Sequence, residues 1–204
     1  MKKAFTLIEL LATIAIIAVL AALTSVGWNS TRKLSLQTQC LQNLKSAGLA
    51  INLYTGEHDG TLPGPTFWSQ KSMPDDSRFL AAYLGPYLGY NISLTSGNYT
   101  KVDTFRCPCA TWSELSYLAC QQMKGGTIPD KSPWGDSSTG STAENLAPVR
   151  MATFSSLGIK LSSQWALRDS YGTAPADNPG LGMRGPCRHG KTSVLFFDGH
   201  VAAE

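Results

Sequence analysis

Hydrophobic residues are concentrated at the start of the chain. No charged residue lies between Leu10 and Thr31, and these 22 residues are rich in Leu, Ile, Ala and Val. As a helix the stretch would be about 33 Å long, and a bilayer core requires about 20 apolar residues. Lys2 and Lys3 precede it, and basic residues favour the cytoplasmic side of a membrane. The pattern predicts a transmembrane helix with a cytoplasmic N-terminus.

Two alternatives share this pattern. A basic start followed by an apolar stretch is typical of a secretory signal peptide, although this run is long and residues 21–25 form only a loose cleavage site. A plain signal anchor is the second alternative. Neither accounts for Glu9, because a carboxylate in an apolar helix costs roughly 2.5–3.5 kcal/mol on insertion scales. Lys2 and Lys3 are beyond helical i+3 and i+4 reach, so we expect the partner of Glu9 to come from another copy of the chain.

The helical pattern continues beyond the apolar stretch. Gly27 is a candidate flexible point, and no proline occurs before Pro63. We therefore predict one helix from about Phe5 to about Tyr54, roughly 75 Å long. Breaker residues at 58–60 and 63–65 end it. In its second half, four positions recur on one face and predict core packing: Leu41, Leu44, Gly48 and Ile51.

The remainder of the chain is rich in Gly, Pro, Ser and Thr. Its pattern predicts a short helix at 78–88, a loop at 125–143 and one or two strands within 149–167. Residues 192–197 read as a strand. Asp198-Gly199 predicts a tight turn, because such turns require positive φ. A return strand beginning at His200-Val201 would complete a hairpin in a small antiparallel sheet packed against the long helix.

Composition narrows the class of protein. Of the 204 residues, 43% are hydrophobic and 15% are charged, against about 25% charged in an ordinary soluble domain. Low hydrophobicity with high net charge marks disordered chains, and this chain has neither. The formal net charge is only +3, which argues against a nucleic-acid partner bound by bulk charge.

The first nine residues resemble the processing signal of type IV pilins and type II secretion pseudopilins. The resemblance rests on the basic leader, on Phe5, on the position of Glu9 and on the apolar run that follows. It implies cleavage by a prepilin peptidase between Ala4 and Phe5, and N-methylation of the new Phe5 amine. Glu9 would pair with the Phe5 amine of a neighbouring subunit during assembly. The family usually has Gly before the cut, whereas this chain has Ala4.

The resemblance also implies an α+β, pilin-like fold. A leader at 1–4 would precede a transmembrane and filament-core helix at 5–28. An amphipathic helix at 29–56 would continue into a globular head at 57–204 that has long loops. The chain would sit in the bacterial inner membrane as a single-pass protein with its head in the periplasm, and later in a periplasmic or cell-surface filament. Its partners would be other copies or related pilins, the prepilin peptidase, the inner-membrane assembly platform and ATPase, and membrane lipid before assembly.

The C-terminal segment resembles a second element of prepilin-like proteins. His189, Asp198 and Gly199 match an H-x9-DG pattern, with eight intervening residues in place of nine. His189, Asp198 and His200 are also an alternative set of metal ligands. Successive strand residues point to opposite faces, and a turn Asp usually bonds its own backbone. We therefore prefer a structural hairpin and expect no resident cofactor.

Five cysteines are candidates for disulfides, because the head would lie in an oxidising compartment. Because the number is odd, at least one thiol stays free or pairs with a cysteine of another chain. Cys107 and Cys109 are too close in sequence to bridge one another with normal geometry, so we expect different partners for them. Cys40 with Cys107 is one candidate pair, and zinc binding is the alternative. The five are Cys40, Cys107, Cys109, Cys120 and Cys187.

Three functional hypotheses remain. The first is a filament subunit without enzymatic activity, since no Gly-x-Ser-x-Gly elbow or phosphate-binding loop occurs. The second is a membrane-anchored binding module whose head takes a glycan, DNA or an exported substrate. The third adds calcium to the head. Residues 131–136 faintly resemble the Pro-Trp-Gly loop of major pseudopilins, and oxygen ligands are available at Asp130, Asp136 and Asp198.

Overall fold

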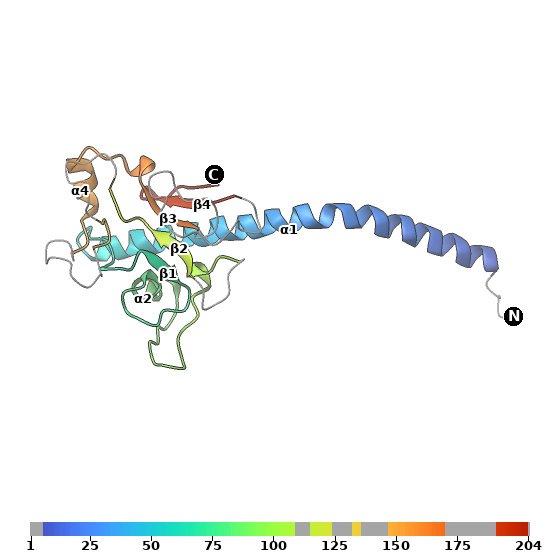
Figure 1. Ribbon diagram of the computed structural model, residues 1–204, viewed down its shortest axis with the longest axis horizontal. Helices are drawn as coiled ribbons and strands as arrows, with labels where there is room; N and C mark the ends of the chain where they lie inside the picture. Colours follow the sequence, from blue (N-terminus) through green and yellow to red (C-terminus); the bar gives the residue numbers. More distant parts are fainter. Residues whose placement is uncertain (1–5, 109–114, 124–131, 136–146, 170–190, 204) are drawn as a thin grey trace.

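The structure is a computed structural model of the full chain. It describes residues 6–108, 115–123, 132–135, 147–169 and 191–203, and within the first range it leaves out the side chains of residues 24–27 and 29. One long helix carries a head at its C-terminal half and extends away from that head towards the N-terminus (Figure 1). The last described residues lie in the head, far from the free end of the helix (Figure 1).

Helix α1 runs without a break from Leu7 to Glu57, about 77 Å. It passes through Gly27 as a regular helix. The chain leaves the helix at His58, where Asp59 and Gly60 both adopt positive φ, 53° and 73°. The predicted helix and the breakers that end it are confirmed. The end falls three residues later than Tyr54, because the imidazole of His58 stacks on the Tyr54 ring at 3.8 Å between centroids and stabilises the last turn.

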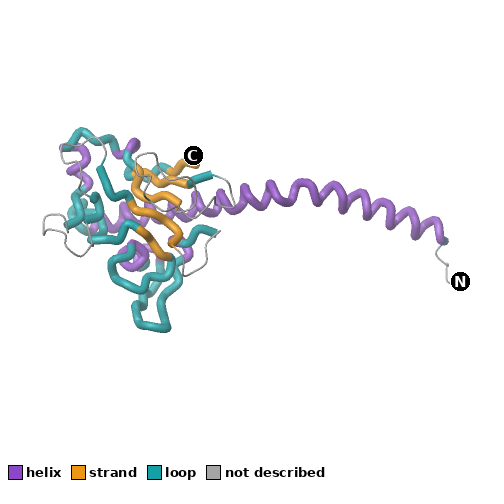
Figure 2. Tube along the Cα trace, in the orientation of Figure 1, coloured by secondary structure: helices purple, strands orange, loops and turns teal. Residues whose placement is uncertain are grey.

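Five short strands form one antiparallel sheet in chain order. They are β1 (Ser69–Lys71), β2 (Leu115–Ala119), β3 (Trp165–Asp169), β4 (Ser193–Phe196) and β5 (Val201–Ala203). Each strand pairs with the next one in sequence, so the sheet is a meander with β1 and β5 at its edges. The expected α+β, pilin-like arrangement of a long helix on a small antiparallel sheet is confirmed (Figure 2).

The second half of α1 packs on β4 and β5. Leu44 is fully buried and Ile51 is 4% exposed, which confirms the predicted core face. Gly48 brings the helix close to the sheet: a Cβ at this position would lie 2.9 Å from Leu195 Cδ1 on β4. The hairpin predicted at the C-terminus is also confirmed, since β4 and β5 pair from Ser193 with Ala203 to Leu195 with Val201.

Short helices complete the head. The predicted helix at 78–88 is present in two pieces, α2 (Leu80–Leu84) and the 3₁₀ turn η1 (Pro86–Leu88). Another 3₁₀ turn, η2, covers Asp103–Phe105 and packs on α1.

The prediction of strands within 149–167 was largely wrong. This segment forms α4 (Met151–Ser156) and the 3₁₀ turn η3 (Leu161–Ser163), and β3 begins only at Trp165. The helix α4 has no side-chain N-cap, and its six residues are too few to show a helical period. It forms because Phe154 is buried, with its ring 4.7 Å from that of Phe197 on the C-terminal turn. Tertiary packing therefore overrides the local sequence preference.

Candidate functional site

The N-terminus of α1 is closed by Thr6 and Glu9. Thr6 is extended (φ −83°, ψ 149°) and acts as the N-cap. Its hydroxyl accepts from the Glu9 backbone N–H at 3.4 Å, while the Glu9 carboxylate accepts from the Thr6 backbone N–H and hydroxyl at 2.9 Å each. This reciprocal capping box satisfies N–H groups that no helical carbonyl reaches.

The capping box gives Glu9 a local partner that our search for a cation missed. The signal is present in the sequence as Thr6-Leu7-Ile8-Glu9, which fits the pattern of Ser or Thr followed three residues later by Glu. Ala4 and Phe5 lie outside the described residues.

Residues 7–35 of α1, hereafter the stem, stand free of the head. Every stem residue whose side chain is described is exposed. Its large apolar side chains range from 56% exposed at Leu20 to 82% at Leu7. Single exposed apolar residues are normal, but a continuous apolar surface of this kind marks an interaction site.

In the part of the chain whose side chains are described, no helix combines the length and apolar character needed to cross a membrane. The transmembrane span predicted at 5–28 is therefore not confirmed.

The head begins to cover α1 at Leu36 and Gln37, which are partly buried, and Cys40 is the first fully buried residue of the helix. Cys40 Sγ donates to both carboxylate oxygens of Asp169 on β3, at 3.1 and 3.3 Å. The Sγ atoms of Cys40 and Cys107 and a carboxylate oxygen of Asp169 lie within 4.8 Å of one another. Burial, together with the charges of Cys40 and Asp169, raises the pKa of Tyr117 on β2 well above its ordinary value.

The remaining cysteines fall into two groups. Cys120 is buried away from this cluster, where its Sγ donates to the Gln122 carbonyl and accepts from Gln164 Nε2, both at 3.0 Å. Cys109 and Cys187 lie outside the described residues. The structure thus brings Cys40 and Cys107 together and separates Cys120 from them, while the zinc and disulfide alternatives for this pair stay predictions.

The C-terminal turn is tied to α1. Gly199 has φ 85° and its N–H donates to the Phe196 carbonyl at 2.9 Å, so the positive φ expected at this position is present. Lys45 Nζ donates to the Gly199 carbonyl at 2.7 Å. The His200 ring stacks on Phe196 at 4.1 Å. The turn therefore closes the hairpin and also anchors it to the helix.

Asp198 interacts with His200 within the same turn. Its Oδ1 accepts from the His200 backbone N–H at 3.1 Å and contacts His200 Nδ1 at 2.5 Å. Partial burial acts to raise the pKa of Asp198, but the hydrogen bonds from His200 outweigh it and lower the pKa. His189 lies outside the described residues, so the proposed set of His189, Asp198 and His200 stays a prediction.

The predicted calcium ligands are not brought together by any described contact. Asp130 and Asp136 lie outside the described residues, and Asp198 bonds His200. Between the first two, Trp134 is fully buried, with its ring 5.2 Å from that of Phe197. The described part of the Pro-Trp-Gly segment is therefore a turn that contributes to the core.

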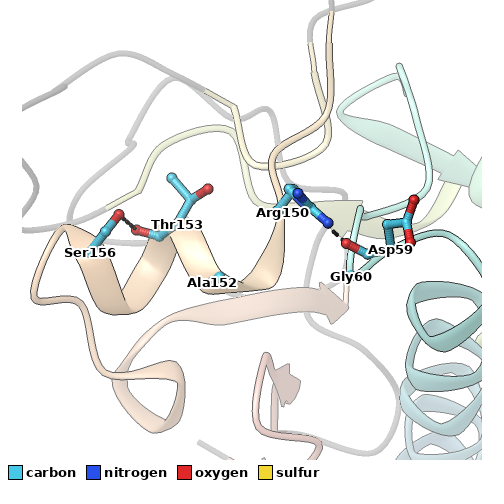
Figure 3. A pocket seen from close by; sticks show the side chains of 6 residues that line it. All are labelled: Asp59, Gly60, Arg150, Ala152, Thr153 and Ser156. Carbon is cyan, nitrogen blue, oxygen red and sulfur yellow. Dashed lines mark hydrogen bonds between the residues drawn. The ribbon is translucent and has the colours of Figure 1, made fainter.

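A surface pocket lies where the chain leaves α1 and meets α4 (Figure 3). Its volume is about 310 Å³. Arg150 Nε donates to the Asp59 carbonyl at 2.8 Å and so joins its two sides. Hydroxyl groups from α4 supply the other polar lining. The lining residues are Asp59, Gly60, Arg150, Ala152, Thr153 and Ser156.

Comparison with known proteins identifies one segment. Residues 1–25 match the family model of the prokaryotic N-terminal methylation motif, the signature of type IV pilins and pseudopilins. The match covers the leader, Phe5, Glu9 and most of the apolar run, and it confirms the resemblance of this segment. The resemblance of the C-terminal element is not confirmed. No curated protein and no solved structure matches the chain.

Proposed function

We propose that this chain is a structural subunit of a type II secretion pseudopilus or a type IV pilus-like filament. The methylation motif marks a pilin-like substrate of prepilin peptidase and favours a structural subunit over an enzyme. The observation that carries the proposal is the exposed apolar stem, which begins within that motif and continues beyond it. Such a surface needs partners, and neighbouring stems in a filament would supply them.

In this proposal the peptidase cuts between Ala4 and Phe5 and the Phe5 amine is methylated. Removing Lys2 and Lys3 lowers the formal side-chain charge from +3 to +1. Before assembly the stem is held in the inner membrane, with its N-terminus facing the cytoplasm and the head in the periplasm. The assembly platform and its ATPase then transfer it into the filament.

The role of Glu9 in assembly follows from where its charge is held. The capping box keeps the carboxylate at the N-terminal end of the stem, where the helix dipole favours a negative charge. In an apolar environment this carboxylate is costly unless it is paired. The methylated Phe5 amine of a neighbouring subunit would be such a partner, so pairing would also set the axial register between stems.

The test uses the full chain in a bacterium that carries its assembly system. Glu9→Leu and Glu9→Gln remove the charge, whereas Thr6→Ala removes the capping hydroxyl and keeps the carboxylate. We expect all three to be cleaved after Ala4, measured as loss of the leader by mass spectrometry. The two Glu9 variants should be lost from sheared filaments, and Thr6→Ala should be incorporated. Normal incorporation of both Glu9 variants would contradict the proposal.

A second candidate is a membrane-anchored binding module. It is favoured by the pocket between Asp59 and α4, where the Arg150 guanidinium and the hydroxyls of Thr153 and Ser156 could contact a glycan, DNA or an exported substrate. The same experiment separates the two functions, because an anchored binder needs no pairing between stems. Under the binding hypothesis, Arg150→Ala would abolish ligand retention while leaving filament incorporation unchanged.

A further inference from the structure

The junction between stem and head lies at Cys40. The described side chains from Thr6 to Ser35 are exposed, Leu36 and Gln37 are partly buried, and Cys40 is the first residue of α1 with no exposed surface. Any force that passes between a stem packed among its neighbours and the head must cross this part of α1. The contacts around Cys40 therefore decide how firmly the two parts are joined.

Cys107 is brought to this junction by hydrogen bonds from the helix. Asn43, one turn beyond Cys40, donates through Nδ2 to the carbonyl of Arg106 at 2.9 Å and to that of Asp103 at 3.3 Å. The first bond fixes the peptide group that precedes Cys107. Both cysteines have 0% exposed surface, and their Sγ atoms lie within 4.8 Å of one another.

We propose that Cys40 and Cys107 form a disulfide that covalently joins the long helix to the head at the stem junction. The proposal rests on the proposed function, since that function places the head in the periplasm, where disulfides persist. The Sγ atoms of the two cysteines, which lie within 4.8 Å of one another, would have to approach to the bond length of about 2.05 Å.

The oxidant is a protein disulfide of the thiol–disulfide exchange class. The thiolate of one cysteine attacks a sulfur of that disulfide, which expels one thiolate and leaves a mixed disulfide. The thiolate of the second cysteine attacks the sulfur of the first, which releases the second thiolate of the oxidant. The pair loses two electrons to the oxidant and two protons to solvent. Because both sulfurs are buried in the folded head, exchange must precede closure of the core.

Zinc is the competing occupant of this cluster, and the described donors favour the disulfide. A structural zinc site takes four ligands, and among the described residues the cluster offers three: Cys40, Cys107 and Asp169. The Tyr117 hydroxyl lies 3.5 Å from Cys40 Sγ, but a phenol is not among the usual ligands of structural zinc. Asp169 Oδ2 already accepts from the Ser193 backbone N–H at 3.0 Å, so this carboxylate has a structural role that needs no metal.

The primary test maps the bond in the full chain purified from the periplasmic side of the membrane. Denatured protein is treated with iodoacetamide without reductant and then digested with trypsin. We expect peptide 34–45, which contains Cys40, to be linked to peptide 107–124, and reduction should separate the two. Since the second peptide also contains Cys109 and Cys120, the assignment is completed in the Cys109→Ser and Cys120→Ser variants, which should keep the link.

A stability measurement provides an independent readout. The bond would close a loop of about 68 residues, and its loss should lower the melting temperature by about 10 °C. The melting temperature should therefore fall by the same amount in three variants, because each loses the same bond. These are Cys40→Ser, Cys107→Ser and the double variant. Cys120→Ser is the matched control, because it removes a buried thiol and leaves the proposed bond in place. Reductant should lower the melting temperature of this variant and of the parent chain by the same amount.

Two results would overturn the proposal. Alkylation of both Cys40 and Cys107 without reductant would show that they are thiols, and one zinc per chain measured by mass spectrometry of the native protein would assign the cluster to metal. Either result with normal filament incorporation would leave the proposed function intact. Conversely, a linked pair together with normal assembly of the Glu9 variants would contradict the filament role alone.

Discussion

The two halves of α1 are built from similar aliphatic residues and lie in opposite environments. In the stem, apolar side chains occur on all sides of the helix and are exposed. In residues 36–57, hereafter the head-bound half, a buried stripe that includes Leu44 and Ile51 faces the sheet. A helix that is apolar all round requires partners on every side, whereas a stripe requires one. The contrast shows that the distribution of apolar side chains around the helix, more than their number, indicates how many partners a helix needs.

The largest effect on stability is expected from a matched pair of side-chain truncations, one in each half of α1. Leu44→Ala should lower the free energy of unfolding of the head by about 3 kcal/mol, because it leaves a cavity in the core. Leu20→Ala removes the same atoms from the exposed stem and should change head stability by less than about 0.5 kcal/mol. Thermal unfolding of the full chain in detergent, followed by near-ultraviolet circular dichroism, measures both. Equal losses of stability in the two variants would contradict the contrast between the buried and the exposed half of α1.

A smaller effect is expected from filling a close contact. Gly48→Leu should cost about 1–3 kcal/mol, because the added side chain meets Leu195 on β4. Gly56→Leu is the control on the same helix, since a Cβ there has no neighbour within 4 Å. The control should be neutral or should gain up to about 1 kcal/mol from helix propensity. Urea unfolding of both variants gives the two values, and a stable Gly48→Leu would mean that α1 does not pack tightly on the sheet.

The contact between Lys45 and the C-terminal turn should contribute less to the free energy of unfolding than the packing at Leu44 and Gly48. Lys45→Met keeps most of the aliphatic side chain and removes the bond to the Gly199 carbonyl, which we expect to cost about 1 kcal/mol. Lys33→Met makes the same change in the stem and should leave the melting temperature of the head unchanged. Amide hydrogen exchange in β5 sharpens the test, because faster exchange should appear in the Lys45 variant alone.

The smallest effect concerns pH. The pKa of Asp198 is lowered in the folded chain, so its ionised form stabilises the fold at pH values above its unfolded pKa of about 3.9. This contribution is lost as the pH falls through the lower folded value. Asp198→Asn should therefore reduce the decline in melting temperature as the pH falls below about 4. Asp76→Asn is a necessary comparison, since a side-chain bond from Arg78 also lowers the pKa of Asp76. A pH profile of Asp198→Asn that matches the parent chain would contradict the assignment.

Local signals in the sequence predicted the parts of the fold that depend on neighbouring residues. The long helix followed from periodicity and the absence of proline, and the C-terminal hairpin followed from Asp198-Gly199. Helix α4 was missed because it depends on Phe154 packing against Phe197, a contact that no local pattern contains.

The site was predictable to a similar extent. The position of Glu9 and the apolar run are local, and they were sufficient to find the methylation motif. The capping box was also local, but it was overlooked because only cationic partners were considered. In contrast, the contact of Cys40 with Asp169 joins residues 129 positions apart, and sequence spacing alone gives no reason to bring them together.

The uninterrupted course of α1 makes the stem a lever. From Leu7 to Ser35 it is about 43 Å long, so a tilt of about 5° at Cys40 would swing its tip sideways by about 4 Å. A sideways displacement of that size would carry the Glu9 carboxylate out of hydrogen-bonding distance of an amine on a neighbouring stem. Alignment of charges at the far end of the protein therefore depends on angular stiffness at the head, and packing around Cys40 sets the precision with which distant subunits can register.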